Sequence, residues 1–186
     1  MTRRRLQLAA AVVFVLGLAG ASIALASGGD KGHGKQGKGN FRAKLIGFQE
    51  VPVVNTTGHA KLRLSLTATE ITFQLDYAGL SGPPLFAHIH AGQRSVNGGV
   101  AVFFCGGGGK PACPNSPSGT VSGTIDAGDV IGPASQGFDP SNLEAVERAI
   151  RAGVAYANMH TTKFPGGEIR GQIKHGHGEG DRHDHK

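Results

Sequence analysis

Residues 61–77 read KLRLSLTATEITFQLDY, and their apolar side chains recur at every second position. These positions are Leu62, Leu64, Leu66, Ile71, Phe73, Leu75 and Tyr77. Because successive side chains of a strand point to opposite faces, this period predicts two strands with one buried face each. Residues 68–70 between them are short enough for a hairpin connection. The stretch therefore predicts a half-buried antiparallel β-hairpin.

Weaker strand signals occur on both sides of this hairpin, separated by Gly and Pro. The chain has 31 Gly and 9 Pro among its 186 residues, without the Gly-X-Y period of collagen. The segments are 41–48, 85–91, 99–105, 119–125, 154–160 and 168–174. Short strands at this spacing are typical of a sandwich or barrel. We predict an all-β fold, an antiparallel Greek-key β-sandwich or barrel-like domain with one short helix.

That helix is expected to begin at a cap formed by Ser141. Ser141 and Glu144 have the spacing of a capping box, in which each side chain bonds the other residue's backbone amide. Gly153 suits the left-handed conformation that ends many helices. We expect this helix to cover an open end of the β-sandwich.

The two ends of the chain differ in composition from its middle. Residues 1–26 have the basic, apolar and Ala-x-Ala layout of a secretory signal peptide, with an uncleaved membrane anchor as the alternative. Residues 27–40 are a Gly- and Lys-rich segment without apolar side chains, predicted to be a flexible linker. The domain is assigned to residues 41–174, and residues 175–186 are predicted to be a His-rich disordered tail.

Export would change the net charge of the mature chain and the chemistry expected of its two cysteines. The formal net charge is +6, and removal of the three signal-segment arginines leaves about +3, which argues against a nucleic-acid partner. Cys105 and Cys113 enclose GGGGKPA, and in an oxidising compartment we expect them to form one local disulfide. The alternative, a metal or redox pair, has no C-x-x-C spacing to support it.

Two longer stretches and one short motif carry a family resemblance. Residues 84–92 read PLFAHIHAG, residues 156–172 read YANMHTTKFPGGEIRGQ, and residues 49–52 read QEVP. Together they resemble the CHRD family, whose domain is repeated in chordin and occurs singly in many bacterial secreted proteins. The resemblance covers about residues 41–174 and implies an extracellular β-sandwich-like module. Chordin antagonises bone-morphogenetic-protein signalling, but this chain has no evident cysteine-rich module that could carry that binding.

Read without the family, the H-x-H motif offers candidate metal ligands. In a strand, His88 and His90 share one face with Phe86. The opposite face, predicted to face the core, carries Leu85, Ala87 and Ile89. Two imidazoles on one face can bind a single ion, and His160 is a candidate third ligand if its strand lies alongside. Nitrogen ligands favour copper or zinc over calcium.

A purely structural role for these histidines is the competing interpretation. His88 and His90 could hydrogen-bond backbone groups around residues 92–99, and His160 could hold the turn at residues 164–167. A similar H-x-H strand occurs in copper/zinc superoxide dismutases, but this is an analogy of two residues on a β-sandwich. The counterpart of that enzyme's full ligand set is not evident in the sequence.

Three charged candidates remain: Glu168 and Arg170 on the last predicted strand, and Glu50 near the start of the domain. Ile169 and Ile173 are expected to face the core, which places Glu168 and Arg170 on the opposite face. Arg170 is predicted to form a salt bridge with Glu168 or Glu50, or else to bind an anionic group.

These observations lead to one main hypothesis and two alternatives. The main hypothesis is a secreted, non-catalytic binding module whose partner is an extracellular protein, a matrix or a metal ion. Contact with a membrane is expected only through an uncleaved signal segment. The first alternative is a protein- or matrix-interaction module with structural histidines, and the second is a copper-dependent redox enzyme of the superoxide-dismutase type. The tail histidines could bind metal weakly through changing ligand sets.

Overall fold

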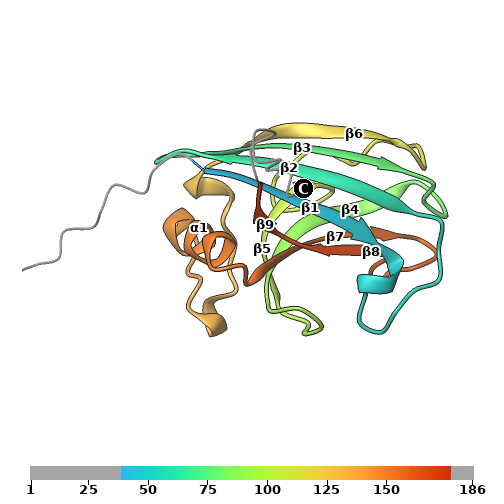
Figure 1. The fold of residues 1–186 in the computed structure, drawn as a ribbon. Helices are drawn as coiled ribbons and strands as arrows, with labels where there is room; N and C mark the ends of the chain where they lie inside the picture. Colours follow the sequence, from blue (N-terminus) through green and yellow to red (C-terminus); the bar gives the residue numbers. More distant parts are fainter. Residues whose placement is uncertain (1–38, 177–186) are drawn as a thin grey trace, which may run out of the picture. The chain divides into compact units, whose positions relative to one another are not determined.

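The computed structural model describes residues 39–176, which form one antiparallel sheet rolled into a barrel (Figure 1). The strands are β1 (Gly39–Ile46), β2 (His59–Leu66), β3 (Ile71–Ala78), β4 (Pro84–Ala91), β5 (Gly99–Cys105), β6 (Gly119–Ile125), β7 (Ala155–Thr161), β8 (Ile169–Gln172) and β9 (Lys174–His175). The helices are the 3₁₀ turns η1 (Gly47–Gln49), η2 (Ala127–Asp129) and η3 (Ala134–Gln136), and α1 (Leu143–Arg151). The predicted signal segment lies outside the described residues.

The boundaries of the domain extend slightly beyond the predicted ones. β1 begins at Gly39, within the segment assigned to the linker, and the rest of that segment lies outside the described residues. β9 includes His175, the first residue assigned to the tail. The His175 ring lies 4.3 Å from the ring of Phe41, centroid to centroid, so this histidine packs on the barrel.

The strand order confirms the predicted all-β Greek-key class. Along the sheet the order is β5-β4-β7-β8-β1-β2-β3-β6, with β9 paired to β1. The two ends of this path, β5 and β6, contact each other, which nearly closes the barrel. Around the barrel β3, β6, β5 and β4 are therefore neighbours in that order, and this is the arrangement of a Greek key.

The alternating pattern of the central hairpin fills the barrel interior. β2 and β3 pair in register from Leu66 with Ile71 onward, and their apolar side chains are buried. The Phe73 ring of β3 lies 4.7 Å from the Phe104 ring of β5, so the core joins strands from both halves of the path. The predicted hairpin is confirmed.

α1 lies at one end of the barrel, and its cap differs from the predicted one (Figure 1). Ser141 has a φ of 64° and lies outside the helix. Asn142 is the cap instead, and its side-chain oxygen accepts a hydrogen bond from the Ala145 amide at 3.1 Å. The left-handed conformation predicted for Gly153 is present, with a φ of 70°. Among residues 39–176, no helix is long and apolar enough to cross a membrane.

The predicted core face of β4 is correct at two of three positions. Ala87 and Ile89 are fully buried, whereas Leu85 is 38% exposed. The register of β4 with β7 shifts between Pro84 and Phe86, so the regular alternation does not extend back to Leu85. Leu85 therefore belongs to the surface near the start of the strand.

This difference gives a matched pair of variants on one strand. We expect Ile89→Ala to lower the free energy of unfolding by about 2–5 kcal/mol, because it leaves a cavity in the core. Leu85→Ala should cost less than about 1 kcal/mol, because water already reaches that side chain. Urea unfolding of both variants measures the two effects, and equal losses would contradict this placement of Leu85.

Candidate metal centre

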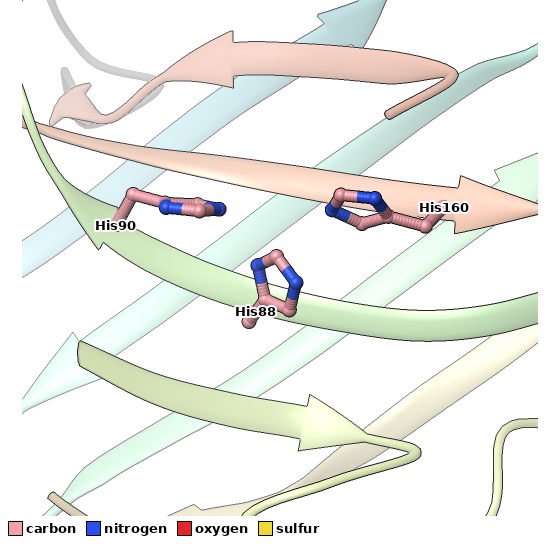
Figure 2. A group of neighbouring side chains, drawn as sticks. All are labelled: His88, His90 and His160. Atoms are coloured by element: carbon pink, nitrogen blue, oxygen red, sulfur yellow. The ribbon is translucent and has the colours of Figure 1, made fainter. Parts of the chain in front are cut away.

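Three histidines from two neighbouring strands lie together on the outer face of the barrel. His88 and His90 come from β4, and His160 comes from β7 (Figure 2). The register pairs His160 with Phe86 and places Asn158 opposite His88, so the three histidines occupy adjacent positions of the same face. The structure therefore brings together all three predicted ligands.

The three imidazoles are turned toward a shared space. One ring nitrogen from each histidine lies within 4.8 Å of the corresponding nitrogens of the other two. Figure 2 shows the His88 ring between those of His90 and His160. Nitrogens bound to one ion at about 2.0–2.1 Å would be about 3–4 Å apart, so the rings need to approach one another only slightly.

Hydrogen bonds from Nδ1 to backbone carbonyls orient two of the rings, those of His90 and His160. His90 Nδ1 lies 2.8 Å from the carbonyl oxygen of Gly98, and His160 Nδ1 lies 2.9 Å from that of Pro165. A carbonyl only accepts, so Nδ1 carries the proton in both residues and Nε2 keeps its lone pair. This is the arrangement in which protein histidines usually bind metals.

Two of the remaining ring nitrogens are buried without a partner. These are Nδ1 of His88 and Nε2 of His160. A buried polar atom that makes no hydrogen bond costs about 1–3 kcal/mol. A metal ion bound to these nitrogens would remove that cost, so the residues present fit copper or zinc.

Burial also keeps the histidines neutral, which is the form that binds metal. It lowers the pKa of His88 to about 2, with smaller contributions from the neighbouring His90 and His160. Burial lowers the pKa of His90 to about 4, although the hydrogen bond to Gly98 opposes the shift. The pKa of His160 is lowered for the same reason, against the opposing bond to Pro165.

The predicted disulfide borders this cluster. Cys105 and Cys113 are joined, as expected from their spacing. Within the loop that they close, Gly107 lies so near the ring of Phe103 that a Cβ there would collide with it. The Phe103 ring in turn lies 5.0 Å from the His88 ring, centroid to centroid. The disulfide loop thus supports an aromatic wall of the candidate site.

Arg170 supports the opposite side of the cluster. Its guanidinium lies 3.5 Å from the centroid of the Tyr156 ring, and that ring stacks on His90 at 4.6 Å with an angle of 6° between planes. The Tyr156 hydroxyl accepts a hydrogen bond from the Gly98 amide at 3.2 Å. Arg170 therefore lies on the far side of the Tyr156 ring from the His90 imidazole and fixes that ring as its stacking partner.

The predicted salt bridge of Arg170 with a carboxylate is wrong. The guanidinium donates to the carbonyl oxygens of Gln93 and Val96 at 3.0 and 2.8 Å, and to Asn97 Oδ1 at 3.2 Å. These bonds hold the loop that carries Gly98, so Arg170 fixes the carbonyl that orients His90. The reason is that the loop at residues 92–98 covers this face of β8 and supplies the acceptors that the guanidinium needs.

Glu168 is also buried, and hydroxyl groups rather than cations surround it. Its carboxylate accepts bonds from Thr56 and Thr161 at 2.7 Å each, and from the Ser81 amide and hydroxyl at 2.9 and 2.6 Å. Burial raises its pKa, but these bonds outweigh burial and the net pKa is lowered. An ionised Glu168 thus ties three segments together and does not join the histidine cluster.

Glu50 contacts the cluster through an asparagine that was not predicted. Asn158 Nδ2 donates to Glu50 Oε1 at 2.6 Å, while Asn158 Oδ1 is buried without a partner beside His88. Burial raises the pKa of Glu50 to about 7, against the bond from Asn158 and the charge of Arg170. Tyr156 and Asn158 precede His160 by four and two residues, so the same period-two pattern could have identified both.

The fold and its histidines define a Greek-key β-barrel domain with a nitrogen-rich cluster on one outer face. Comparison with protein families gives a match to the CHRD domain over residues 41–173. The chain therefore belongs to the CHRD-domain family, as the sequence motifs indicated. No curated protein and no solved structure matches the chain.

The lowered histidine pKa values predict the pH dependence of stability. Below the ordinary value of 6.5 the unfolded chain takes up protons that the folded imidazoles do not, so the free energy of unfolding falls with pH. Glu50 acts in the opposite direction, because its folded pKa of about 7 lies above its ordinary 4.5. Burial also raises the pKa of Glu147, which acts in the same direction as Glu50. With three histidines against these two carboxyls, we expect a net loss of stability on acidification. Urea unfolding of metal-free protein at about pH 7.5 and about pH 5.5 measures it.

Glu50→Gln provides the internal control for this experiment. It removes the opposing contribution of Glu50, so the loss of stability between the two pH values should be larger in this variant than in the wild type. An equal or smaller loss in Glu50→Gln would show that Glu50 does not have the raised pKa.

Proposed function

We propose that this chain is an exported, non-catalytic binding module that holds one copper or zinc ion between His88, His90 and His160. One observation supports the metal above all. Two buried imidazole nitrogens face a shared space without a hydrogen-bond partner, while hydrogen bonds at the back of the rings orient His90 and His160. Nitrogen ligands in this number suit both copper and zinc.

Export is supported by two independent features. The layout of residues 1–26 is that of a signal peptide, although these residues lie outside the described part of the chain. The Cys105–Cys113 disulfide is compatible with an oxidising compartment. The module would therefore act outside the cytoplasm.

An ion bound by three histidines has a coordination position left for another group. His90 and His160 are only half-buried, so this position would be open to water or to a donor group of a partner. A carboxylate or imidazole on an extracellular protein or matrix could complete the coordination. In this way the metal would serve binding rather than chemistry.

The alternative of purely structural histidines also has a specific observation in its favour. His90 and His160 each hold a loop or turn through Nδ1, as that interpretation expects. The two interpretations differ at His88, whose buried Nδ1 makes no hydrogen bond. A variant at His88 is therefore the most informative.

The metal is tested in full-length chain in which His177, His183 and His185 are replaced by Gln, so that the tail does not contribute. We expect one equivalent of copper or zinc to remain bound after loading at neutral pH and desalting. His88→Ala should weaken binding by more than about tenfold, because loss of even an outer partner of a metal ligand costs about that much. Titration calorimetry, and the nitrogen hyperfine pattern of bound copper, measure the effect.

His59→Ala is the matched control, because His59 is an exposed histidine of β2. It should leave affinity unchanged. Absence of a stoichiometric ion, or equal losses in the two variants, would leave the structural interpretation of the histidines in place of the metal site.

The redox-enzyme alternative is tested on the same copper-loaded protein. A non-catalytic module should remove superoxide no faster than its His88→Ala variant with the same amount of copper added. A rate that depends on His88 would replace the binding role with a catalytic one.

A further inference from the structure

A second feature of the barrel lies on different strands from the histidines. A hollow of about 1510 Å³ extends over the outer faces of β1, β2 and β3 and reaches β6 and β9. Figure 1 shows β1, β2, β3 and β6 side by side along one side of the barrel. The hollow is lined by six basic side chains, which we call the cationic face: Arg42, Lys44, Lys61, Arg63, Arg94 and Lys174.

The positive charge of the cationic face does not simply reflect the total charge of the described residues. Residues 39–176 contain eleven Lys and Arg and nine Asp and Glu, so their formal charges nearly cancel. More than half of those cations line the hollow, and none of the described acidic residues does. Within the described part of the chain, Arg63 alone among the six forms an ion pair, with Asp76 at 2.7 Å.

The sheet places these cations directly opposite one another. Arg42 of β1 pairs with Arg63 of β2 and with Lys174 of β9, and Lys44 pairs with Lys61. Like charges in opposite positions of neighbouring strands destabilise a sheet. The repulsion therefore lowers the stability of the folded barrel. An anionic ligand that neutralises the row on β1 (Arg42 and Lys44) and the row on β2 (Lys61 and Arg63) would remove it.

The spacing and surroundings of the cations suit an extended anionic chain. Neighbouring strands are about 4.8 Å apart, and alternate residues of a strand about 7 Å, so the two rows present charges at regular short intervals. Hydroxyl and amide groups line the same hollow: Ser65, Thr72, Gln74, Ser122 and Thr124. These groups match the hydroxyls of a sugar, and the cations match its carboxylates or sulfates.

The large exposed apolar side chains lie elsewhere. Among the described residues they are Phe48, Val53, Leu85, Phe86, Val96 and Ile131, and none lines the hollow. The cationic face thus has no such side chain to insert into a lipid bilayer. We propose that it binds an acidic polysaccharide, with carboxylate or sulfate groups on the two rows of cations. This proposal does not depend on a metal at the histidines.

The test uses dextran sulfate as the probe and uncharged dextran as its control. The protein should bind dextran sulfate and not dextran, and affinity should fall with added salt. Lys44→Gln/Lys61→Gln should lose at least about tenfold in affinity while its melting temperature stays equal or rises, because one like-charge pair has been removed. Arg148→Gln/Lys163→Gln removes the same net charge outside the hollow and should bind within about twofold of the wild type.

Three outcomes would overturn the proposal. Equal binding of dextran and dextran sulfate would show that the charge is not recognised. Equal losses in the two double variants would show that only net charge matters. Binding to vesicles with anionic lipid, without binding to dextran sulfate, would assign the face to a membrane surface instead.

Discussion

The stacking of the Arg170 guanidinium on the Tyr156 ring is the interaction on which the candidate site depends. Burying a cation is costly unless its donors are satisfied. Here the aromatic ring and three acceptors of the loop at residues 92–98 offset that cost. The same contacts fix both the stacking surface of His90 and the Gly98 carbonyl behind it. A residue that does not touch the cluster thus determines the orientation of one of its imidazoles.

The structural and ligand roles of the histidines are compatible, because an imidazole has two nitrogens. In His90 and His160 the first nitrogen holds the backbone and the second faces the shared space. Because Nδ1 donates to a backbone carbonyl, each ring has the tautomer in which Nε2 keeps its lone pair and can bind an ion. The question of whether these histidines are structural is therefore decided at His88.

Much of the fold follows from local sequence, and the parts that do not have a common cause. β5 and β6 match their predicted ranges residue for residue, because the apolar run of β5, the period-two pattern of β6 and the glycines at their ends are local signals. The sequence could group the three histidines, because His88 and His90 share one face of a strand and the strand of His160 was assumed to be its neighbour. The burial of Glu168 and Arg170 could not be predicted, because segments more than seventy positions away cover them. The carbonyls of Gly98 and Pro165 carry no side-chain signal at all.

The strand order has a consequence for the number of partners. β4 and β7 carry the histidines, whereas β1 and β2 carry most of the cationic face, and β8 lies between these pairs in the sheet. Two ligands of unlike chemistry would therefore occupy separate strands of one rigid barrel. Such a barrel is bivalent, and a partner held at one face raises the effective concentration of anything tethered to that partner at the other. If both proposed sites are occupied, one small domain would link two ligands of unlike chemistry.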